Sequence, residues 1–319
     1  NFDKKCEFFL KFIEDIMFAN MKFNYKRHFL ICGGYACGTS NLSETLSQNS
    51  KIKLLKRDDG REYNFFKTDR FYRKGVGWYQ KQFFKNPDKL TIDHSSQILT
   101  SSKAIKRLYK FNPDARIIII LRDRIERSWA DYRYSILNGF EKYSFYKSLL
   151  IEKVRYKNET FHFKQEKPFS YFERSNYLKY LKILFRYFPK KNVLILNSED
   201  LRKKQNKNLL KAFKFMNLKM HKIKKASIFS SFYIKNIKFQ HNIRNHFKNK
   251  NINPIIEKIR SNKKINYNQY TAKQVLMIKK IKNNIIKKIP EIPSDAYIWL
   301  KEKFKKDSKI LKKITGYNL

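Results

Sequence analysis

Residues 29–42 read Phe29-Leu-Ile-Cys-Gly-Gly-Tyr-Ala-Cys-Gly-Thr-Ser-Asn-Leu42, a short apolar run followed at once by a loop with three glycines. The run predicts a buried strand, and the residues after Gly38 predict the start of a helix. Glycine lets a backbone turn tightly and approach a ligand, while the amide N–H groups at a helix N-terminus point at an anion. The stretch therefore predicts a phosphate-binding strand-loop-helix unit, although the glycines are equally consistent with a plain tight turn.

The loop differs from the phosphate loop of ATPases at one position. The stretch from Gly33 to Ser40 fits the pattern G-x-x-x-x-G-K-[ST], except that Thr39 occupies the place of the lysine. That lysine holds the β- and γ-phosphates, so its absence removes a principal charge clamp for the transfer of a terminal phosphoryl group. The loop therefore disfavours an NTPase or a kinase.

Short apolar runs alternate with longer amphipathic segments along the whole chain. The strand candidates are residues 29–32, 52–55, 90–93, 116–121 and 193–196. Each is followed by polar or turn residues and then by helical spacing, which is typical of a mainly parallel sheet flanked by helices. We therefore expect an α/β fold.

No repeat and no linker rich in glycine and serine divides the 319 residues, so we expect a single domain over residues 1–319. Residues 1–27 are expected to form an N-terminal lead-in helix. Residues 140–174 are a candidate insertion over the site, and residues 219–264 have no clear assignment.

The composition is that of a folded and strongly basic protein. Hydrophobic residues make up 42%, and 72 Lys and Arg against 27 Asp and Glu give a formal charge of +45, which concentrates anionic ligands. Much of this charge also fits the Lys, Asn and Ile bias of an AT-rich genome. Because the chain has no zinc-finger spacing, aromatic RNA-binding motif or basic zipper, we expect no specific nucleic acid partner. Nucleic-acid binding stays an alternative that rests on charge alone.

The three cysteines include no C-x-x-C pair, which fits a reducing compartment better than a disulfide framework. His241 and His246 lie five residues apart, a spacing that does not bring them together on a helix, so we expect no metal site. Residues 8–18 are too short and too charged to span a bilayer, and we expect no transmembrane segment in this chain. The first residue is Asn rather than Met, which indicates a fragment or trimmed chain.

Two further segments carry candidate chemistry. Arg122 directly follows the run 116–121, and the carboxyl ends of strands in an open parallel sheet face the ligand crevice. An arginine there can bind a phosphate through two parallel hydrogen bonds, or it can pair with Asp123 at the start of a helix. Glu62 lies in the aromatic stretch Arg61-Glu-Tyr-Asn-Phe-Phe66, where partial burial suits a general base. A surface glutamate is the simpler explanation for that residue alone.

Together these segments resemble the sulfotransferase family, most closely its heparan-sulfate N-/O-sulfotransferase branch, which uses 3′-phosphoadenosine 5′-phosphosulfate. The resemblance covers most of the chain. The loop at 33–42 is similar to the 5′-phosphosulfate loop of the family, and residues 122–139 are similar to its 3′-phosphate motif. Three further elements match in order. They are Glu62-Tyr-Asn-Phe-Phe66 for Glu-x-x-Phe-Phe, Lys74-Gly-Val-Gly-Trp-Tyr79 for Lys-Gly-x-x-Trp-Tyr, and Asp93-His-Ser-Ser96 for Glu-Lys-Ser-Pro.

The resemblance implies metal-free transfer of a sulfonate group from 3′-phosphoadenosine 5′-phosphosulfate to a hydroxyl or amine of a carbohydrate or other anionic, glycosaminoglycan-like acceptor, with release of adenosine 3′,5′-bisphosphate. It implies Glu62 as the general base, with His94 and Lys74 as further catalytic residues. The implied cofactor-binding residues are Tyr35, Ala36, Cys37, Gly38, Thr39, Ser40, Asn41, Arg122 and Ala130. Bacterial relatives are cytoplasmic and eukaryotic ones reside in the Golgi lumen, and the cysteine pattern favours the cytoplasm.

The chain departs from the family pattern at three positions. Ala36 stands where the loop has a lysine, Ala130 stands where the 3′-phosphate motif has a serine, and His94 replaces another lysine. Ser128 is no obvious substitute for the missing serine, since residues two apart on a helix point to nearly opposite sides. A second interpretation is therefore open, in which the protein is a catalytically weakened sulfotransferase-like binder of nucleotide or glycan.

Overall fold

The computed structural model describes residues 24–57, 62–84, 88–158, 169–220, 223, 232–246, 255–256, 258–259 and 264–319. These residues form two compact units. The first takes its described residues from Asn1–Gly33, Gly38–Leu121 and Tyr180–Lys225, and the second from Gly34–Cys37, Arg122–Lys179 and Ala226–Leu319. The predicted single domain over residues 1–319 stays a prediction. The predicted lead-in helix at 1–27 lies outside the described residues except for its end, where Tyr25–Arg27 form a 3-10 helix.

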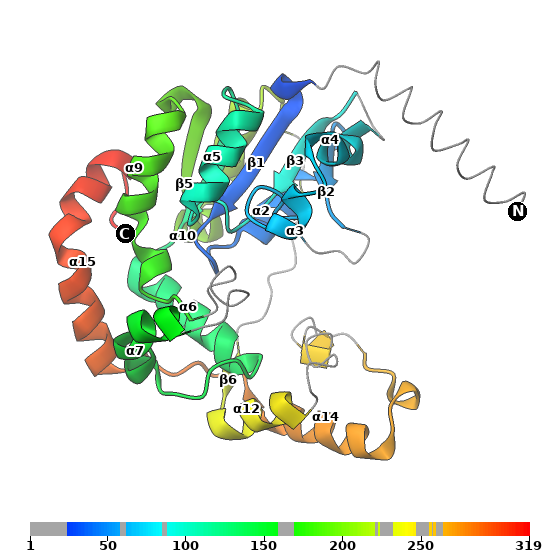
Figure 1. Ribbon diagram of the computed structural model, residues 1–319, viewed down its shortest axis with the longest axis vertical. Helices are drawn as coiled ribbons and strands as arrows, with labels where there is room; N and C mark the ends of the chain where they lie inside the picture. The colour runs from blue at the N-terminus through cyan, green and yellow to red at the C-terminus, as the bar shows by residue number, and fades with distance from the viewer. Residues whose placement is uncertain are drawn as a thin grey trace, which may run out of the picture. The chain divides into compact units, whose positions relative to one another are not determined.

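The described part of the first unit is built on a five-stranded parallel sheet in the order β2-β3-β1-β4-β5 (Figure 1). Its strands are β1 (His28–Gly33), β2 (Ile52–Leu55), β3 (Leu90–His94), β4 (Arg116–Leu121) and β5 (Val193–Asn197). Each predicted apolar run forms one of them, so the predicted α/β fold is confirmed. All six residues of β1 and the last five of β4 are buried, because helices cover both faces of a parallel sheet.

The strand order decides which chain segments meet at the carboxyl edge of the sheet. Since β1 pairs in parallel with β3, the glycine loop and the segment after His94 leave the sheet side by side. There the Ser95 amide donates to the Ile31 carbonyl at 3.0 Å, and the Gly33 amide donates to the Ser96 carbonyl at 3.2 Å.

Amphipathic helices connect the strands of the first unit. Helix α5 shows the pattern, since Ser101 caps its first turn and every third or fourth residue from Ala104 to Phe111 is buried. The helices are α2 (Thr39–Leu46), α3 (Asp69–Tyr72), α4 (Val76–Phe84), α5 (Ser102–Phe111), α9 (Tyr177–Tyr187, which begins in the second unit), α10 (Ser198–Lys203) and α11 (Gln205–Phe215).

The second unit is largely helical, with a short antiparallel pair of strands. Its elements are α6 (Arg124–Leu137), α7 (Phe145–Asn158), η2 (Glu173–Ser175), β6 (Tyr233–Ile234), α12 (Ile237–His246), η4 (Tyr267–Gln269), α14 (Ala272–Asn284), β7 (Ile285–Ile286) and α15 (Ser294–Thr315). The described parts of the predicted insertion at 140–174 and of the unassigned stretch at 219–264 supply α7, η2, β6 and α12.

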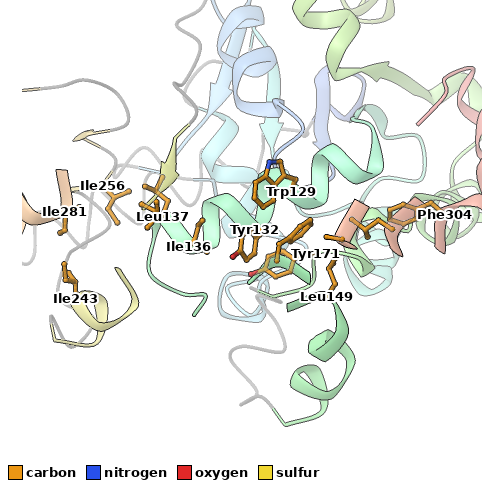
Figure 2. Packing of buried hydrophobic residues seen from close by; sticks show 14 residues of the cluster. Trp129, Tyr132, Ile136, Leu137, Leu149, Tyr171, Ile243, Ile256, Ile281 and Phe304 are labelled. Atoms are coloured by element: carbon orange, nitrogen blue, oxygen red, sulfur yellow. The ribbon is translucent and has the colours of Figure 1, made fainter. Parts of the chain in front are cut away.

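The aromatic face of α6 forms the centre of the core of the second unit. Figure 2 shows Trp129, Tyr132 and Tyr171 close together, and the rings of Trp129 and Tyr132 stack with centroids 5.5 Å apart. At the start of α6, the buried Arg124 guanidinium donates to the Phe304 carbonyl at 2.9 Å and to Ser308 Oγ at 2.6 Å, which ties α6 to α15. Among the helices of the described ranges, none combines the length and the apolar character needed to cross a lipid bilayer.

Candidate functional site

The two ends of the glycine loop in the first unit have distinct structural reasons for their glycines. A Cβ atom at Gly33 would lie 2.2 Å from the Ile120 carbonyl oxygen, so only glycine fits beside β4. Gly38 adopts a left-handed backbone with φ 87° and is the N-cap of α2. Glycine has no side chain to cap the amides of the first helical turn, at Thr39, Ser40 and Asn41. These amides are therefore able to bind an anion, as the sequence predicts.

The tip of the loop, Gly34 to Cys37, belongs to the second unit. The Tyr35 carbonyl accepts a hydrogen bond from Arg127 Nη1 at 3.4 Å. Ala36 has a left-handed backbone with φ 64°, which is uncommon for a residue with a Cβ atom. The Cys37 thiol is buried 3.6 Å from the Tyr177 hydroxyl, and burial raises its pKa. Cys37 is therefore a neutral packing residue, and its backbone is the part able to contact a ligand.

A buried ionic cluster supports the loop tip. Asp131 Oδ2 lies 2.9 Å from Arg127 Nη1 and 3.1 Å from Arg174 Nη1, and all three residues are almost fully buried. Arg127 also donates to the Tyr171 carbonyl, and the Arg174 guanidinium lies 5.0 Å from the centroid of the Tyr35 ring. With two guanidinium groups and one carboxylate, the cluster keeps one positive charge. The cluster was not predicted from the sequence, although Arg127 and Asp131 have the i,i+4 spacing of a helical ion pair.

Ala130 lies on α6, and Arg122 precedes Asp123, the N-cap residue of that helix. Arg122 Nη2 pairs with Glu126 Oε2 at 3.0 Å, and its side chain is 30% exposed. Asp123 instead caps the helix, because its Oδ1 accepts from the amides of Ile125 and Glu126. Ala130 is half-buried. Ser128 Oγ lies 2.9 Å from both the Arg124 and Tyr171 carbonyls, so it is occupied in the helix packing.

The predicted general base belongs to a hydrogen-bonded cluster in the first unit. Glu62 Oε2 accepts from the Ser96 amide at 3.0 Å, the Ser96 hydroxyl at 2.8 Å and Asn64 Nδ2 at 3.0 Å. Glu62 Oε1 lies 3.2 Å from His94 Nε2, and the Glu62 side chain is 24% exposed. Burial lowers the pKa of His94, so its imidazole is neutral at neutral pH. The carboxylate is thus held by one oxygen while solvent still reaches the group.

The structure brings together two of the three predicted catalytic residues, Glu62 and His94. Lys74 is exposed, and its ammonium group lies 4.6 Å from the centroid of the Trp78 ring. Of the predicted cofactor-binding residues, Tyr35 to Cys37 lie together at the loop tip, and Gly38 to Asn41 form the start of α2.

A second polar network in the first unit involves Asp93. Its carboxylate accepts hydrogen bonds from the Tyr79 hydroxyl and, at 2.7 Å, from Ser95 Oγ. The Tyr79 hydroxyl oxygen also lies 3.0 Å from His28 Nε2. Burial raises the pKa of Asp93 to about 6 and lowers that of His28 to about 3. Asp93 thereby fixes the segment that carries His94 and Ser96. In the sequence, the only sign of this network is that Asp93, a polar residue, ends an apolar strand candidate.

Comparisons with known proteins agree on one family. The family model for the sulfotransferase domain matches residues 26–290. The chain is 28% identical over 192 residues to heparan sulfate glucosamine 3-O-sulfotransferase 5 of Homo sapiens, covering 59% of this chain and 53% of the relative. It is 25% identical over 173 residues to heparan sulfate glucosamine 3-O-sulfotransferase 3B1 of Homo sapiens, covering 54% and 41%. The chain therefore spans about half the length, or less, of these curated relatives.

A solved structure supports the fold. The sulfotransferase from Alicyclobacillus acidocaldarius superposes with a TM-score of 0.55 at 21% sequence identity, covering 63% of this chain and 85% of that chain.

Proposed function

The chain belongs to the sulfotransferase family, and we propose that it transfers a sulfonate group from 3′-phosphoadenosine 5′-phosphosulfate to a hydroxyl or amine of a carbohydrate acceptor, with Glu62 as the general base. The observation that carries the proposal is the Glu62 carboxylate. Three hydrogen bonds to its Oε2 orient it, yet 24% of the side chain is exposed to solvent, from which an acceptor would approach. A carboxylate held in this way suits the removal of a proton from an incoming nucleophile.

The donor supplies an activated sulfonate whose leaving group is adenosine 3′,5′-bisphosphate. Glu62 takes the proton of the acceptor as the acceptor oxygen or nitrogen bonds to sulfur. Ser96 and Asn64 keep the carboxylate in one rotamer and stabilise its charge before the transfer. The neutral His94 imidazole, beside Oε1, is able to donate a hydrogen bond to the carboxylate or to the reacting groups.

Each unit offers groups that suit one of the two phosphates of the donor nucleotide. The uncapped amides at the start of α2 suit the 5′ end, as does a backbone at Gly38 that has no side chain in the way. The partly exposed Arg122 suits the 3′-phosphate, since a guanidinium matches phosphate oxygens with two donors. These assignments rest on donor chemistry and on the family pattern.

We propose a sulfated or otherwise anionic polysaccharide as the acceptor class. The relatives described above are named for heparan sulfate glucosamine. The formal charge of +45 favours an anionic chain over a neutral sugar, because it raises the local concentration of negative ligands. A cytoplasmic location belongs to the same proposal and rests on the cysteine usage, since the described Cys32 and Cys37 are both free thiols.

A second candidate function is binding of nucleotide or glycan without efficient transfer. Ala36 favours it, because a methyl group stands at the loop position where the resemblance implies a lysine. A lost contact to the leaving group costs about a hundredfold in rate or more.

A transfer assay separates the two functions. The full chain is incubated with radiolabelled 3′-phosphoadenosine 5′-phosphosulfate and heparan-type, N-desulfated and uncharged polysaccharides, and calorimetry measures the affinity for adenosine 3′,5′-bisphosphate. Label in the anionic polysaccharides supports the proposed function. Nucleotide binding without transfer to any acceptor supports the weakened binder, and the absence of both refutes the two candidates together.

A further inference from the structure

One face of α6 carries more basic charge than the family motif explains. Arg122 stands just before the N-cap Asp123 and pairs with Glu126 at 3.0 Å, and Glu126, Ala130 and Arg133 follow one another at intervals of four and three residues on one face of α6. The resemblance assigns a phosphate-binding role to positions 122 and 130. Nothing in it assigns a role to Arg133.

Arg133 is a buried charged residue, and a buried charge normally has a hydrogen-bond or ionic partner. Only 8% of the residue is exposed, and its buried Nε has no hydrogen-bond partner among the residues that the structure describes. Its guanidinium lies 5.9 Å from the centroid of the Trp129 ring, one turn toward the helix N-terminus. Because side chains on a helix lean toward its N-terminus, Arg133 extends over the turn that contains Ala130.

Arg133 lies within electrostatic range of Arg122 and Glu126. Burial and, to a smaller extent, the positive charge of Arg122 lower the pKa of Arg133 to about 10, although Glu126 opposes both effects. Arg133 is therefore still protonated at neutral pH. Glu126 already pairs with Arg122 at 3.0 Å, and it is the one carboxylate that acts on Arg133 among the groups named here. One positive charge in this group is not neutralised within it.

A buried donor without a partner and an excess positive charge both destabilise the ligand-free fold. Binding of an anion removes both penalties. Ala130 carries only a methyl group on this helix face, whereas the serine that the resemblance implies at this position would place a single neutral hydroxyl there.

We propose that Arg133 binds the 3′-phosphate of the donor nucleotide together with Arg122, in place of the serine that the family has at position 130. The inference rests on the proposed function and deepens it at one phosphate. Arg133 supplies a charged donor where the family uses a neutral one. In this chain the guanidinium of Arg133 therefore takes the place of the serine hydroxyl that is lost with Ala130.

The test compares two nucleotides that differ in the 3′-phosphate. Calorimetry measures the affinities of the full chain for adenosine 3′,5′-bisphosphate and for adenosine 5′-phosphate, in the wild type, Arg133→Ala, Arg133→Lys and Arg133→Gln. Arg186→Ala on α9 is the matched control, because it removes one exposed arginine far along the chain from this helix face. Thermal unfolding of each ligand-free variant monitors the fold.

We expect Arg133→Ala and Arg133→Gln to weaken the bisphosphate about 10- to 100-fold while affinity for the 5′-phosphate changes by less than about twofold. Arg133→Lys recovers part of the loss, and Arg186→Ala lowers both affinities slightly and equally. Ligand-free Arg133→Gln is at least as stable as the wild type, because it removes an uncompensated buried charge. Adding Ala130→Ser to Arg133→Ala restores part of the preference for the bisphosphate.

Three results overturn the inference alone: an unchanged preference in Arg133→Ala and Arg133→Gln, an equal loss for both nucleotides, or a marked fall in the stability of ligand-free Arg133→Gln. A wild type that does not prefer the bisphosphate overturns the inference together with the donor assignment of the proposed function.

Discussion

Replacement of Ala36 by lysine tests whether the loop tip lacks a contact to the leaving group. Ala36 already adopts a left-handed backbone with φ 64°, and a lysine has the same Cβ atom. The substitution therefore adds no new backbone strain, which is about 1–3 kcal/mol for a residue with a Cβ atom in this region. The residue is half-buried, so the longer side chain has access to solvent.

Two opposing contributions decide how Ala36→Lys changes the free energy of nucleotide binding. A hydrogen bond from an ammonium group to a phosphate oxygen contributes about 1.5–3 kcal/mol. The new charge is repelled by Arg127 and Arg174, which share the single carboxylate of Asp131, and this repulsion costs about 1 kcal/mol. The expected net gain is about 0.5–2 kcal/mol, or about 2- to 30-fold tighter binding of adenosine 3′,5′-bisphosphate. Turnover rises as well if the contact strengthens in the transition state.

Calorimetry and initial transfer rates measure the two effects. Ala36→Met is the matched control, because it has a similar length and no charge, and Ala36→Gly shows the effect of relieving the backbone. Unchanged affinity and turnover in Ala36→Lys would refute the idea that position 36 is a missing contact. An equal gain in Ala36→Met would refute the role of charge.

Two further predictions concern buried carboxylates. Because the folded-state pKa of Asp93 is raised to about 6 from 3.8, the folded protein holds this proton more tightly than the unfolded chain, so its stability falls as pH rises from about 4 to 6. Across that window the free energy of unfolding of the wild type, measured with urea, should fall by about 3 kcal/mol relative to that of Asp93→Asn. A difference between the two proteins that does not change with pH would contradict the buried state of Asp93. Asp131→Asn leaves Arg127 and Arg174 without their carboxylate, and the free energy of unfolding should fall by about 3–5 kcal/mol. A loss below about 1 kcal/mol in the same urea assay would show that the cluster is not needed for the fold.

The strands were predictable because of their burial. Central parallel strands are covered on both faces and therefore read as unbroken apolar runs, such as the one that forms β4. The same reasoning placed the loop directly after β1. The closeness of Glu62 and His94 came from the order of motifs in the resemblance, since 31 residues separate them and no local pattern links them.

The long-range contacts in the polar networks around Asp131 and Asp93 were not predictable from local sequence patterns. Arg174 lies 43 residues from Asp131, and His28 lies 51 residues from Tyr79. Contacts of this kind depend on how helices and strands pack after they form. The Nε of Arg133, which has no hydrogen-bond partner among the described residues, is likewise a property of the packed helix, because the sequence alone shows only one arginine among many.

The most direct test of the account is the initial rate of radiolabelled sulfonate transfer by Glu62→Gln, measured beside its affinity for adenosine 3′,5′-bisphosphate. Glutamine keeps the size of the side chain and removes its basicity. Glu199→Gln is the matched control, because Glu199 is an exposed carboxylate that pairs with Lys203 on α10. We expect a rate about 10²- to 10⁴-fold below the wild type, with nucleotide affinity nearly unchanged and full activity in the control. A Glu62→Gln variant that transfers sulfonate at the wild-type rate would contradict the role of Glu62 as the base.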